Sequence, residues 1–216
     1  GILELRKKNF YIIGFDESKN PFSKKDVNKF FNVSFLDYKR IEKICKKNNV
    51  RYLFAFSTDA PLKLIAFLNK KLNLSGYKED CIKLVNDKIK LRNFFLKKMN
   101  LSKPSFFYSK NLKDLSLKKI YRLKCPFVCK PSRGSGSRGV FMFENKNQLS
   151  RLFKINQSFY KNKMILIEKF INGTEYAVEG WIYKKKFIYG CLSKKNRTKP
   201  PYLLDTSLII NFDNQK

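Results

Sequence analysis

The segment from residue 125 to residue 143 constrains the fold of this chain more than any other. Its sequence, C-P-F-V-C-K-P-S-R-G-S-G-S-R-G-V-F-M-F, places a loop of small residues between two short apolar runs. The second run is β-branched and aromatic and too short for an amphipathic helix, so the segment predicts a strand, a flexible loop and a second strand. Glycines let such a loop offer backbone N–H groups to phosphate oxygens, and Arg133 and Arg138 add charge-assisted donors. An ordinary exposed hairpin loop is the alternative interpretation.

Two familiar phosphate-binding motifs do not fit this segment. Gly134, Gly136 and Gly139 satisfy the pattern G-x-G-x-x-G, but a dinucleotide-binding fingerprint must open a helix, and a strand is predicted here. A Walker A loop needs a lysine directly after its last glycine, and Val140 stands there instead. The segment instead carries its lysine, Lys130, at the end of the first predicted strand.

Lysines are abundant throughout the chain, and their number alone does not identify a function. The sequence has 47 Lys and Arg against 17 Asp and Glu, a net charge of +30, which would attract nucleic acid non-specifically. These residues are spread along the whole chain together with many Asn, Ile, Phe and Tyr, so we attribute the charge to nucleotide bias in the genome. We therefore expect no nucleic-acid partner, and a basic nucleic-acid-binding module stays the alternative.

The absence of histidine excludes several classes of site. It rules out zinc sites of the mixed Cys/His type, Ser-His-Asp triads and Cys-His pairs. The five cysteines are scattered without a C-x-x-C motif, and we expect reduced thiols. Neither a signal peptide nor an apolar run long enough to span a membrane is present in the sequence, so we predict a cytoplasmic protein without a membrane partner.

The order of the predicted elements divides the chain near residue 85. In the first part strands alternate with helices, a pattern typical of a parallel α/β sheet. Strands are expected there at 10–15, 32–35 and 51–56, and helices at 23–31, 37–48 and 61–71. In the second part we expect helices at 88–99, 112–123 and 147–154, strands at 105–108, 164–170, 175–183 and 187–193, the hairpin at 125–143, a polar loop at 194–201 and an extended segment at 202–212.

Four motifs, taken in order, resemble those of the ATP-grasp superfamily, in particular its carboxylate–amine ligases related to biotin carboxylase and carbamoyl-phosphate synthetase. Leu74-Ser75-Gly76 is similar to the step that closes the family's first domain, and Asn86-Asp87-Lys88 followed by Arg92 is similar to its N-D-K-x-x-x-R helix. The run 127–131 followed by 135–140 resembles its lysine strand and phosphate-covering loop, and the run 167–176 resembles its hinge, E-x-[FY]-I-x-G-x-E. Each motif is weak alone, but together they cover nearly the whole chain.

The resemblance implies an α/β fold with a Rossmann-like pre-ATP-grasp domain at 1–85 and an incomplete ATP-grasp domain at 86–216. It implies that lysines and loop arginines bind the phosphates of ATP, that the backbone of 168–171 grips adenine, and that Glu175 accepts hydrogen bonds from the ribose hydroxyls. The implied ATP-binding residues are Lys88, Lys130, Arg133, Ser135, Gly136, Ser137, Arg138, Gly139, Glu168, Lys169, Phe170, Ile171 and Glu175. Their plainer alternatives are solvated lysines, an ordinary sheet strand and, for Glu175, a surface carboxylate paired with a neighbouring lysine.

The activity implied by the resemblance is ATP-dependent ligation of a small carboxylate to an amine, or to a thiol, through an acyl phosphate, with release of ADP and phosphate. The expected cofactors are ATP and Mg²⁺. The resemblance places the magnesium ligands in a sheet beyond Lys216, so the chain looks like a fragment open at both ends. No metal ligand or catalytic residue is assigned within it. The expected partners are ATP, the carboxylate and the amine, and a homodimer is left open. A nucleotide-binding fragment without catalysis is the second alternative.

Overall fold

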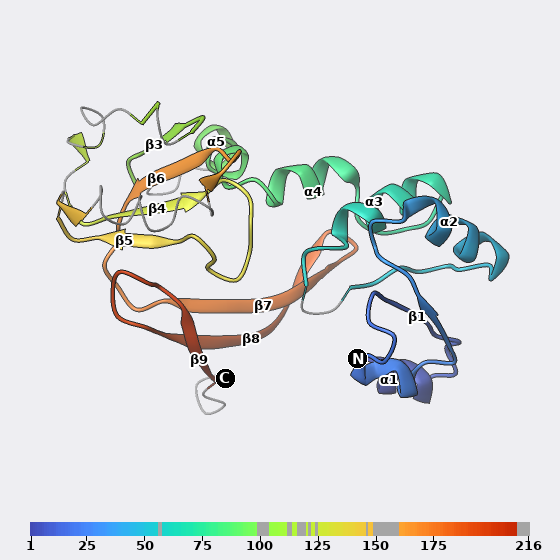
Figure 1. Cartoon of the computed structure of the whole chain (residues 1–216). Helices are drawn as coiled ribbons and strands as arrows, with labels where there is room; N and C mark the ends of the chain where they lie inside the picture. Colours follow the sequence, from blue (N-terminus) through green and yellow to red (C-terminus); the bar gives the residue numbers. More distant parts are fainter. Residues whose placement is uncertain are drawn as a thin grey trace. The chain divides into compact units, whose positions relative to one another are not determined.

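The structure, a computed structural model, describes residues 1–55, 58–98, 104–111, 114–115, 120, 122–123, 125–145, 147–148 and 160–210. The chain divides into two compact units, Gly1–Val85 and Asn86–Lys216, which we call unit 1 and unit 2. Both units combine helices with sheets, so the predicted α/β class is confirmed (Figure 1).

Unit 1 packs helices around a short parallel sheet. Strands β1 (Ile13–Asp16) and β2 (Lys29–Asn32) pair in parallel, as the alternation of strands and helices predicts. The other elements are α1 (Ile2–Lys7), the 3₁₀ helix η1 (Phe22–Asp26), α2 (Tyr38–Lys47), α3 (Leu62–Lys71) and α4 (Glu79–Val85).

Helix α2 illustrates how the sequence sets a local element in unit 1. The Asp37 carboxylate accepts a hydrogen bond from the Arg40 N–H at 3.1 Å, which satisfies a donor that the first helical turn leaves unpaired. Ile41 and Cys45, four residues apart, are both buried on the inner face of the helix. They belong to the core of unit 1, whose buried members are Val33, Ile41, Cys45, Leu64 and Leu68.

Gly76, at the end of the Leu-Ser-Gly step, adopts a conformation that favours glycine. Its φ is +146°, and a Cβ at this position would meet the Asn69 amide nitrogen at 2.5 Å. That amide donates a hydrogen bond to the Tyr77 carbonyl at 3.3 Å, so it cannot move away freely. The glycine therefore allows the chain to turn closely past the end of α3 before α4 begins.

Several predictions for unit 1 are wrong. The helix expected at 23–31 is replaced by η1 and β2, because Phe31 stacks on Phe15 of β1, with 6.0 Å between ring centroids, and β2 must be extended to pair with β1. The strand expected at 32–35 lies earlier, as β2. Residues 51–55 form no strand, residue 56 lies outside the described residues, and α4 is not predicted.

Unit 2 contains two antiparallel sheets and the helix α5 (Lys88–Lys98) (Figure 1). The first sheet has the order β3-β6-β4-β5, with β3 at Phe106–Ser109, β6 at Ile165–Lys169, β4 at Phe127–Pro131 and β5 at Phe141–Phe143. The second sheet has the order β7-β8-β9, with β7 at Tyr176–Tyr183, β8 at Lys186–Arg197 and β9 at Asp205–Ile210. The hairpin predicted at 125–143 is confirmed, because β4 and β5 pair in antiparallel on either side of the glycine loop.

The first sheet carries the core of unit 2. Phe127 and Phe143 face each other across β4 and β5 with 5.1 Å between ring centroids, and both are fully buried. The consecutive apolar residues 165–167 in β6 are all buried, as expected for a strand covered on both faces. The segment between β8 and β9 joins this sheet, since the Met142 N–H donates to the Pro201 carbonyl at 2.9 Å and Phe141 pairs with Tyr202.

Most strands predicted for unit 2 are confirmed to within a few residues, and one loop is wrong in part. β8 continues to Arg197, although a polar loop is predicted to begin at residue 194. The charged side chains there pair with carboxylates on the neighbouring chain segments, so the segment can extend the sheet. The helices predicted at 112–123 and 147–154 fall largely outside the described residues. Met99, the last residue of the helix predicted at 88–99, also lies outside them.

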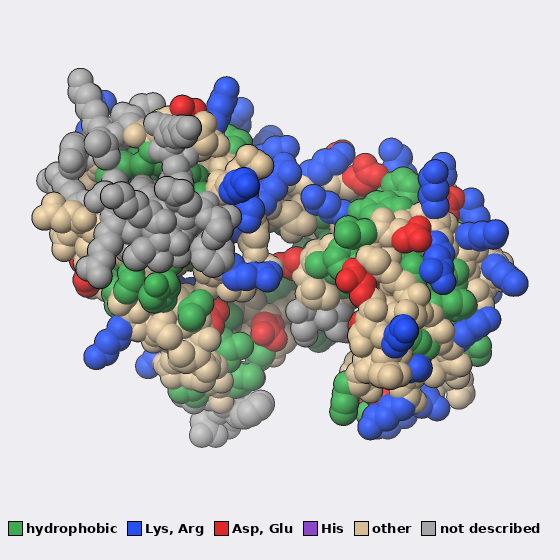
Figure 2. Space-filling view, in the orientation of Figure 1, with side chains coloured by type: hydrophobic (Ala, Val, Ile, Leu, Met, Phe, Trp, Pro, Cys, Tyr) green, Lys and Arg blue, Asp and Glu red, His purple; other side chains and the backbone are tan. Residues whose placement is uncertain are grey.

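Basic side chains are dispersed over the face drawn in Figure 2 and do not gather there into a single patch. This distribution agrees with the interpretation of the lysines drawn from the sequence. Within the described residues, no helix combines the length and the apolar character needed to cross a bilayer.

Candidate functional site

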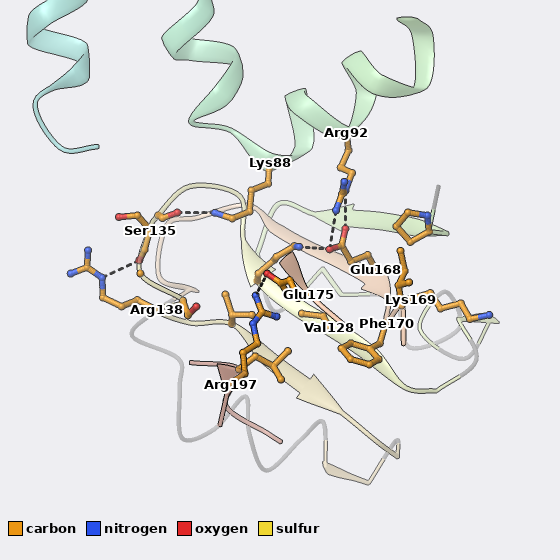
Figure 3. Close-up of a pocket in the computed structure, with 18 residues that line it drawn as sticks. Lys88, Arg92, Val128, Ser135, Arg138, Glu168, Lys169, Phe170, Glu175 and Arg197 are labelled. Carbon is orange, nitrogen blue, oxygen red and sulfur yellow. Dashed lines mark hydrogen bonds and ion pairs between the residues drawn. The ribbon is translucent and has the colours of Figure 1, made fainter. Parts of the chain in front are cut away.

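A cavity of about 450 Å³ opens in unit 2 beside the glycine loop (Figure 3). It is lined by the start of α5, β4, the loop, the end of β6 with the residues after it, β8 and the segment before β9. All the predicted site residues except Arg133 and Gly139 line it. Its charged lining residues are six bases and two acids: Lys88, Arg92, Lys130, Lys169, Arg138 and Arg197, with Glu168 and Glu175.

The Glu168 carboxylate is held between two cations at the inner end of the cavity. Arg92 donates to it from Nε at 2.9 Å and from a terminal nitrogen at 3.3 Å, and the Lys130 ammonium forms a short ion pair with it. Only 8% of the Glu168 side chain is exposed. Burial by itself would raise the pKa of Glu168, but the hydrogen bond from Arg92 and the charge of Lys130 outweigh it and lower that pKa. Glu168 is therefore ionised, and Lys130 is oriented toward the cavity by an acidic neighbour.

The start of α5 is attached to the glycine loop. Lys88 donates from its backbone N–H to the Ser132 carbonyl and from Nζ to the Gly134 carbonyl, both at 2.8 Å. Asp87, which is buried, accepts from the N–H groups of Ile89 and Lys90 and so caps the helix. These contacts place the Lys88 ammonium at the rim of the cavity.

The two loop arginines have different surroundings. Arg133 donates from Nε to the Asp87 carboxylate at 3.3 Å and does not line the cavity. Arg138 lines the cavity and donates from Nε to the Ser135 carbonyl at 3.3 Å, within its own loop. Of the two, Arg138 is the one that stands beside the space that a ligand would occupy.

A buried tyrosine holds the far end of the glycine loop. The Tyr160 hydroxyl donates to the Gly139 carbonyl at 2.8 Å, and Gly139 has a φ of +76°, which favours glycine. Tyr160 packs against Phe141 of β5, with 6.2 Å between ring centroids. The loop is thus joined to the protein at Gly134 through Lys88 and at Gly139 through Tyr160, with residues between these points facing the cavity.

One wall of the cavity is apolar. Val128 and Leu203 are buried and pack together with Met142, and Val140 and Phe170 lie against the same cluster. After β6, the N–H groups of Lys169 and Phe170 donate to the Ser105 and Pro126 carbonyls. Within the described residues the N–H of Ile171 has no partner, and it remains available for a ligand that lies against this wall.

Glu175, directly before β7, also lines the cavity. Its Oε1 accepts from Arg197 at 2.5 Å and lies 3.3 Å from the Lys195 ammonium. The same two cations contact Asp205, at 3.0 Å and 2.7 Å. The hydrogen bond that Lys195 donates to the Asp205 carboxylate raises the pKa of Lys195. Burial by itself would raise the pKa of Asp205, but the hydrogen bonds and charges of Lys195 and Arg197 outweigh it and lower that pKa.

Sequence reasoning gave no site role to several residues that line the cavity. Arg92 is named in the helix motif without a role, and Arg197 and Leu203 are not singled out. The four-residue spacing from Lys88 to Arg92, which places both on one helix face, is a signal that could have indicated Arg92. Arg197 and Leu203 have no such local signal, because their position depends on how β8 and β9 pair.

The described residues offer no site for a divalent metal ion. No group of three or more His, Cys, Asp or Glu side chains is gathered among them. The carboxylates of Glu175 and Asp205 are already paired with Lys195 and Arg197. The described residues therefore do not fit a bound Mg²⁺.

Comparison with known proteins finds a family model that matches much of unit 2. Residues 123–209 match the model of the ATP-grasp domain. A D-alanine–D-alanine ligase of Buchnera aphidicola is 36% identical over 98 residues, which are 45% of this chain and 28% of that protein. The chain thus spans less than a third of the length of this curated relative.

Solved structures share the fold over most of the chain. An L-amino acid ligase from Bacillus licheniformis matches with a TM-score of 0.75 at 20% identity, over 97% of this chain and 51% of that one. The N5-carboxyaminoimidazole synthetase from Staphylococcus aureus, complexed with ADP, matches with a TM-score of 0.72 at 19% identity, over 91% of this chain and 51% of that one. At these identities the likeness concerns the fold.

Proposed function

We propose that unit 2, whose residues 123–209 match the model of the ATP-grasp domain, binds ATP in the cavity beside the glycine loop. The observation that carries the proposal is the joint lining of one cavity by six basic side chains and an apolar wall. A nucleotide requires this combination, because its phosphates need cations and its base needs an apolar surface with a few backbone donors. The volume, about 450 Å³, lies within the range typical of small-molecule sites.

The residues divide by chemistry into parts for each portion of ATP. Lys88, Lys130 and Arg138 would contact the phosphates, together with the N–H groups of residues 135–137. Val128, Leu203 and Phe170 would pack against the adenine, and the Ile171 N–H would donate to it. Glu175 would accept a hydrogen bond from a ribose hydroxyl. The loop, joined to the protein at Gly134 and Gly139, would exclude water from the phosphates when it closes.

For the complete protein we propose ligation of a carboxylate to an amine, the activity that the names of the matched ligases suggest. A carboxylate is a poor acylating agent because its leaving group would be oxide. Transfer of the γ-phosphoryl group to a carboxylate oxygen gives an acyl phosphate and ADP. The amine nitrogen then attacks the carbonyl carbon, the C–O bond to phosphate breaks, and the amine loses a proton. Positioning and charge neutralisation can drive such a reaction without a protein nucleophile.

Titration of a fluorescent ATP analogue into the chain tests the binding proposal. We expect saturable binding that weakens at least tenfold in Lys130→Ala, about the loss expected for one charge-assisted phosphate contact. Lys163→Ala is the matched control, because it removes an exposed lysine just before β6 that does not line the cavity. Equal affinity in the wild type and Lys130→Ala would refute the proposal. Displacement by polyphosphate as effective as that by ATP would instead support the basic nucleic-acid-binding alternative.

The ligation proposal has a separate test in the complete protein. Incubation with ATP, Mg²⁺, a mixture of carboxylates and an amine should yield ADP and phosphate together with the ligated product. Accumulation of AMP and pyrophosphate would exclude the acyl-phosphate route while leaving nucleotide binding intact.

A further inference from the structure

A network of four charges joins the second sheet to the rim of the cavity. Lys195 and Arg197 lie two residues apart on β8, so their side chains share one face of the strand. Asp205, the first residue of β9, pairs with Arg197 across the two strands, at a point where the register shifts. Glu175 approaches the same two cations from the segment before β7. Each of the two bases therefore contacts both of the two acids.

Arg197 is the member of this network that links the cavity to the sheet. It lines the cavity beside Glu175, whereas Lys195 and Asp205 do not (Figure 3). Its guanidinium uses two different nitrogens, a terminal nitrogen toward Glu175 at 2.5 Å and Nε toward Asp205 at 3.0 Å. The fork of donors in arginine is rigid, so a guanidinium held by Asp205 also fixes the direction in which Glu175 is held.

The two carboxylate oxygens of Glu175 are used differently. Oε1 contacts both Arg197 and Lys195. Within the described residues Oε2 has no partner, and Glu175 lines the cavity. A glutamate side chain without these contacts would sample several rotamers, and binding a ligand would have to restrict them. With Oε1 occupied, Oε2 is the oxygen left to accept a hydrogen bond from a ligand hydroxyl.

We infer that Arg197 is a positioning residue that presents the Glu175 carboxylate to the sugar of the nucleotide and makes the site selective for ribonucleotides over deoxynucleotides. This inference rests on the proposed ATP binding. A carboxylate fixed in advance loses a well-formed partner when the sugar lacks its hydroxyls, so the deoxynucleotide binds less tightly. If Glu175 is free to turn, its carboxylate can stay hydrated when the sugar has no hydroxyl to offer. The difference in affinity between the ribonucleotide and the deoxynucleotide then becomes smaller.

The test is the ratio of two Kd values, for 2′,3′-dideoxy-ATP and for ATP, measured by displacement of the fluorescent analogue. We expect the wild type to prefer ATP by at least about tenfold, as for a hydrogen bond to a charged group. Arg197→Met should bring the ratio to within about threefold of unity. Because both nucleotides are measured on the same protein, a general loss of positive charge or a partly folded sample affects both Kd values and cancels in the ratio.

The matched control is Lys194→Met, which removes the same charge from the neighbouring position on β8, on the opposite face of the strand. Its ratio should equal that of the wild type. Glu175→Ala should lower the ratio as Arg197→Met does, and the double variant should show no further fall, because both changes interrupt one contact.

A wild-type ratio retained in Arg197→Met would overturn this inference while leaving ATP binding in place. Failure of the wild type to bind either nucleotide saturably would overturn the proposed function, and this inference with it.

Discussion

Replacement of Glu168 by Gln tests the charge network at the inner end of the cavity. Glutamine keeps the shape of the side chain but removes the charge shared by Arg92 and Lys130. The Lys130 side chain is only 17% exposed, so its ammonium would lose its acidic partner in a place where water cannot fully replace it. Arg92 is 34% exposed and can turn toward solvent.

The expected cost of Glu168→Gln is about 3 kcal/mol in the free energy of unfolding of unit 2 at pH 7. This is the lower end of the range for removing one partner of a buried ion pair, chosen because Arg92 keeps partial contact with water. Urea unfolding followed by the fluorescence of Trp181, the one tryptophan of the sequence, reports on unit 2 because this residue lies in β7. Glu144→Gln, at an exposed position of the same unit, is the control and should change stability by less than about 0.5 kcal/mol.

The loss of unfolding free energy in Glu168→Gln should depend on pH in a definite direction. The native contacts lower the pKa of Glu168 below its ordinary value of 4.5. The stabilisation from its charge is therefore fully present above pH 4.5 and is lost as the pH falls through the folded-state pKa. The difference in the free energy of unfolding between the wild type and Glu168→Gln should therefore become smaller below pH 4.5. A gap of equal size at pH 7 and pH 3, or no gap at pH 7, would refute the role given to this network.

Two further predictions concern the loop and the thiols. Tyr160→Phe removes the hydrogen bond to the Gly139 carbonyl, which is worth about 1 kcal/mol. The loop should then open more often, and trypsin cleavage after Arg133 and Arg138 should become about fivefold faster. An unchanged cleavage rate would show that Tyr160 does not hold the loop. Burial raises the pKa of the Cys129 thiol to about 12 and that of the Cys45 thiol to about 11, whereas Cys81 is exposed. A thiol reagent at pH 7.5 should therefore label Cys81 first and the two buried thiols only after unfolding. Early labelling of Cys129, detected by mass spectrometry of peptides, would contradict the packing of β4.

The hairpin at the cavity could be predicted because its signals are local. Small residues between two short apolar runs define a strand, a loop and a strand without reference to the rest of the chain. Asp87 could be predicted as a cap for the same reason, since the helix donors that it satisfies lie two and three residues away.

The contacts inside the site could not be predicted, because they join distant residues. Arg92 and Glu168 lie 76 positions apart, and their pairing depends on how α5 packs against β6. The extension of β8 to Arg197 depends on carboxylates 8 and 22 positions away, which convert a charged segment from a loop into a strand. In unit 1 the aromatic residue Phe31 overrides a helical pattern by stacking on Phe15.

Hydrogen–deuterium exchange with and without ATP tests the central claim, that the nucleotide binds beside the glycine loop of unit 2. We expect slower amide exchange in peptides covering 127–143 and 165–175, with unchanged exchange in α2 and α3 of unit 1. Protection spread over the lysine-rich peptides of both units, or an identical pattern with inorganic polyphosphate, would contradict it.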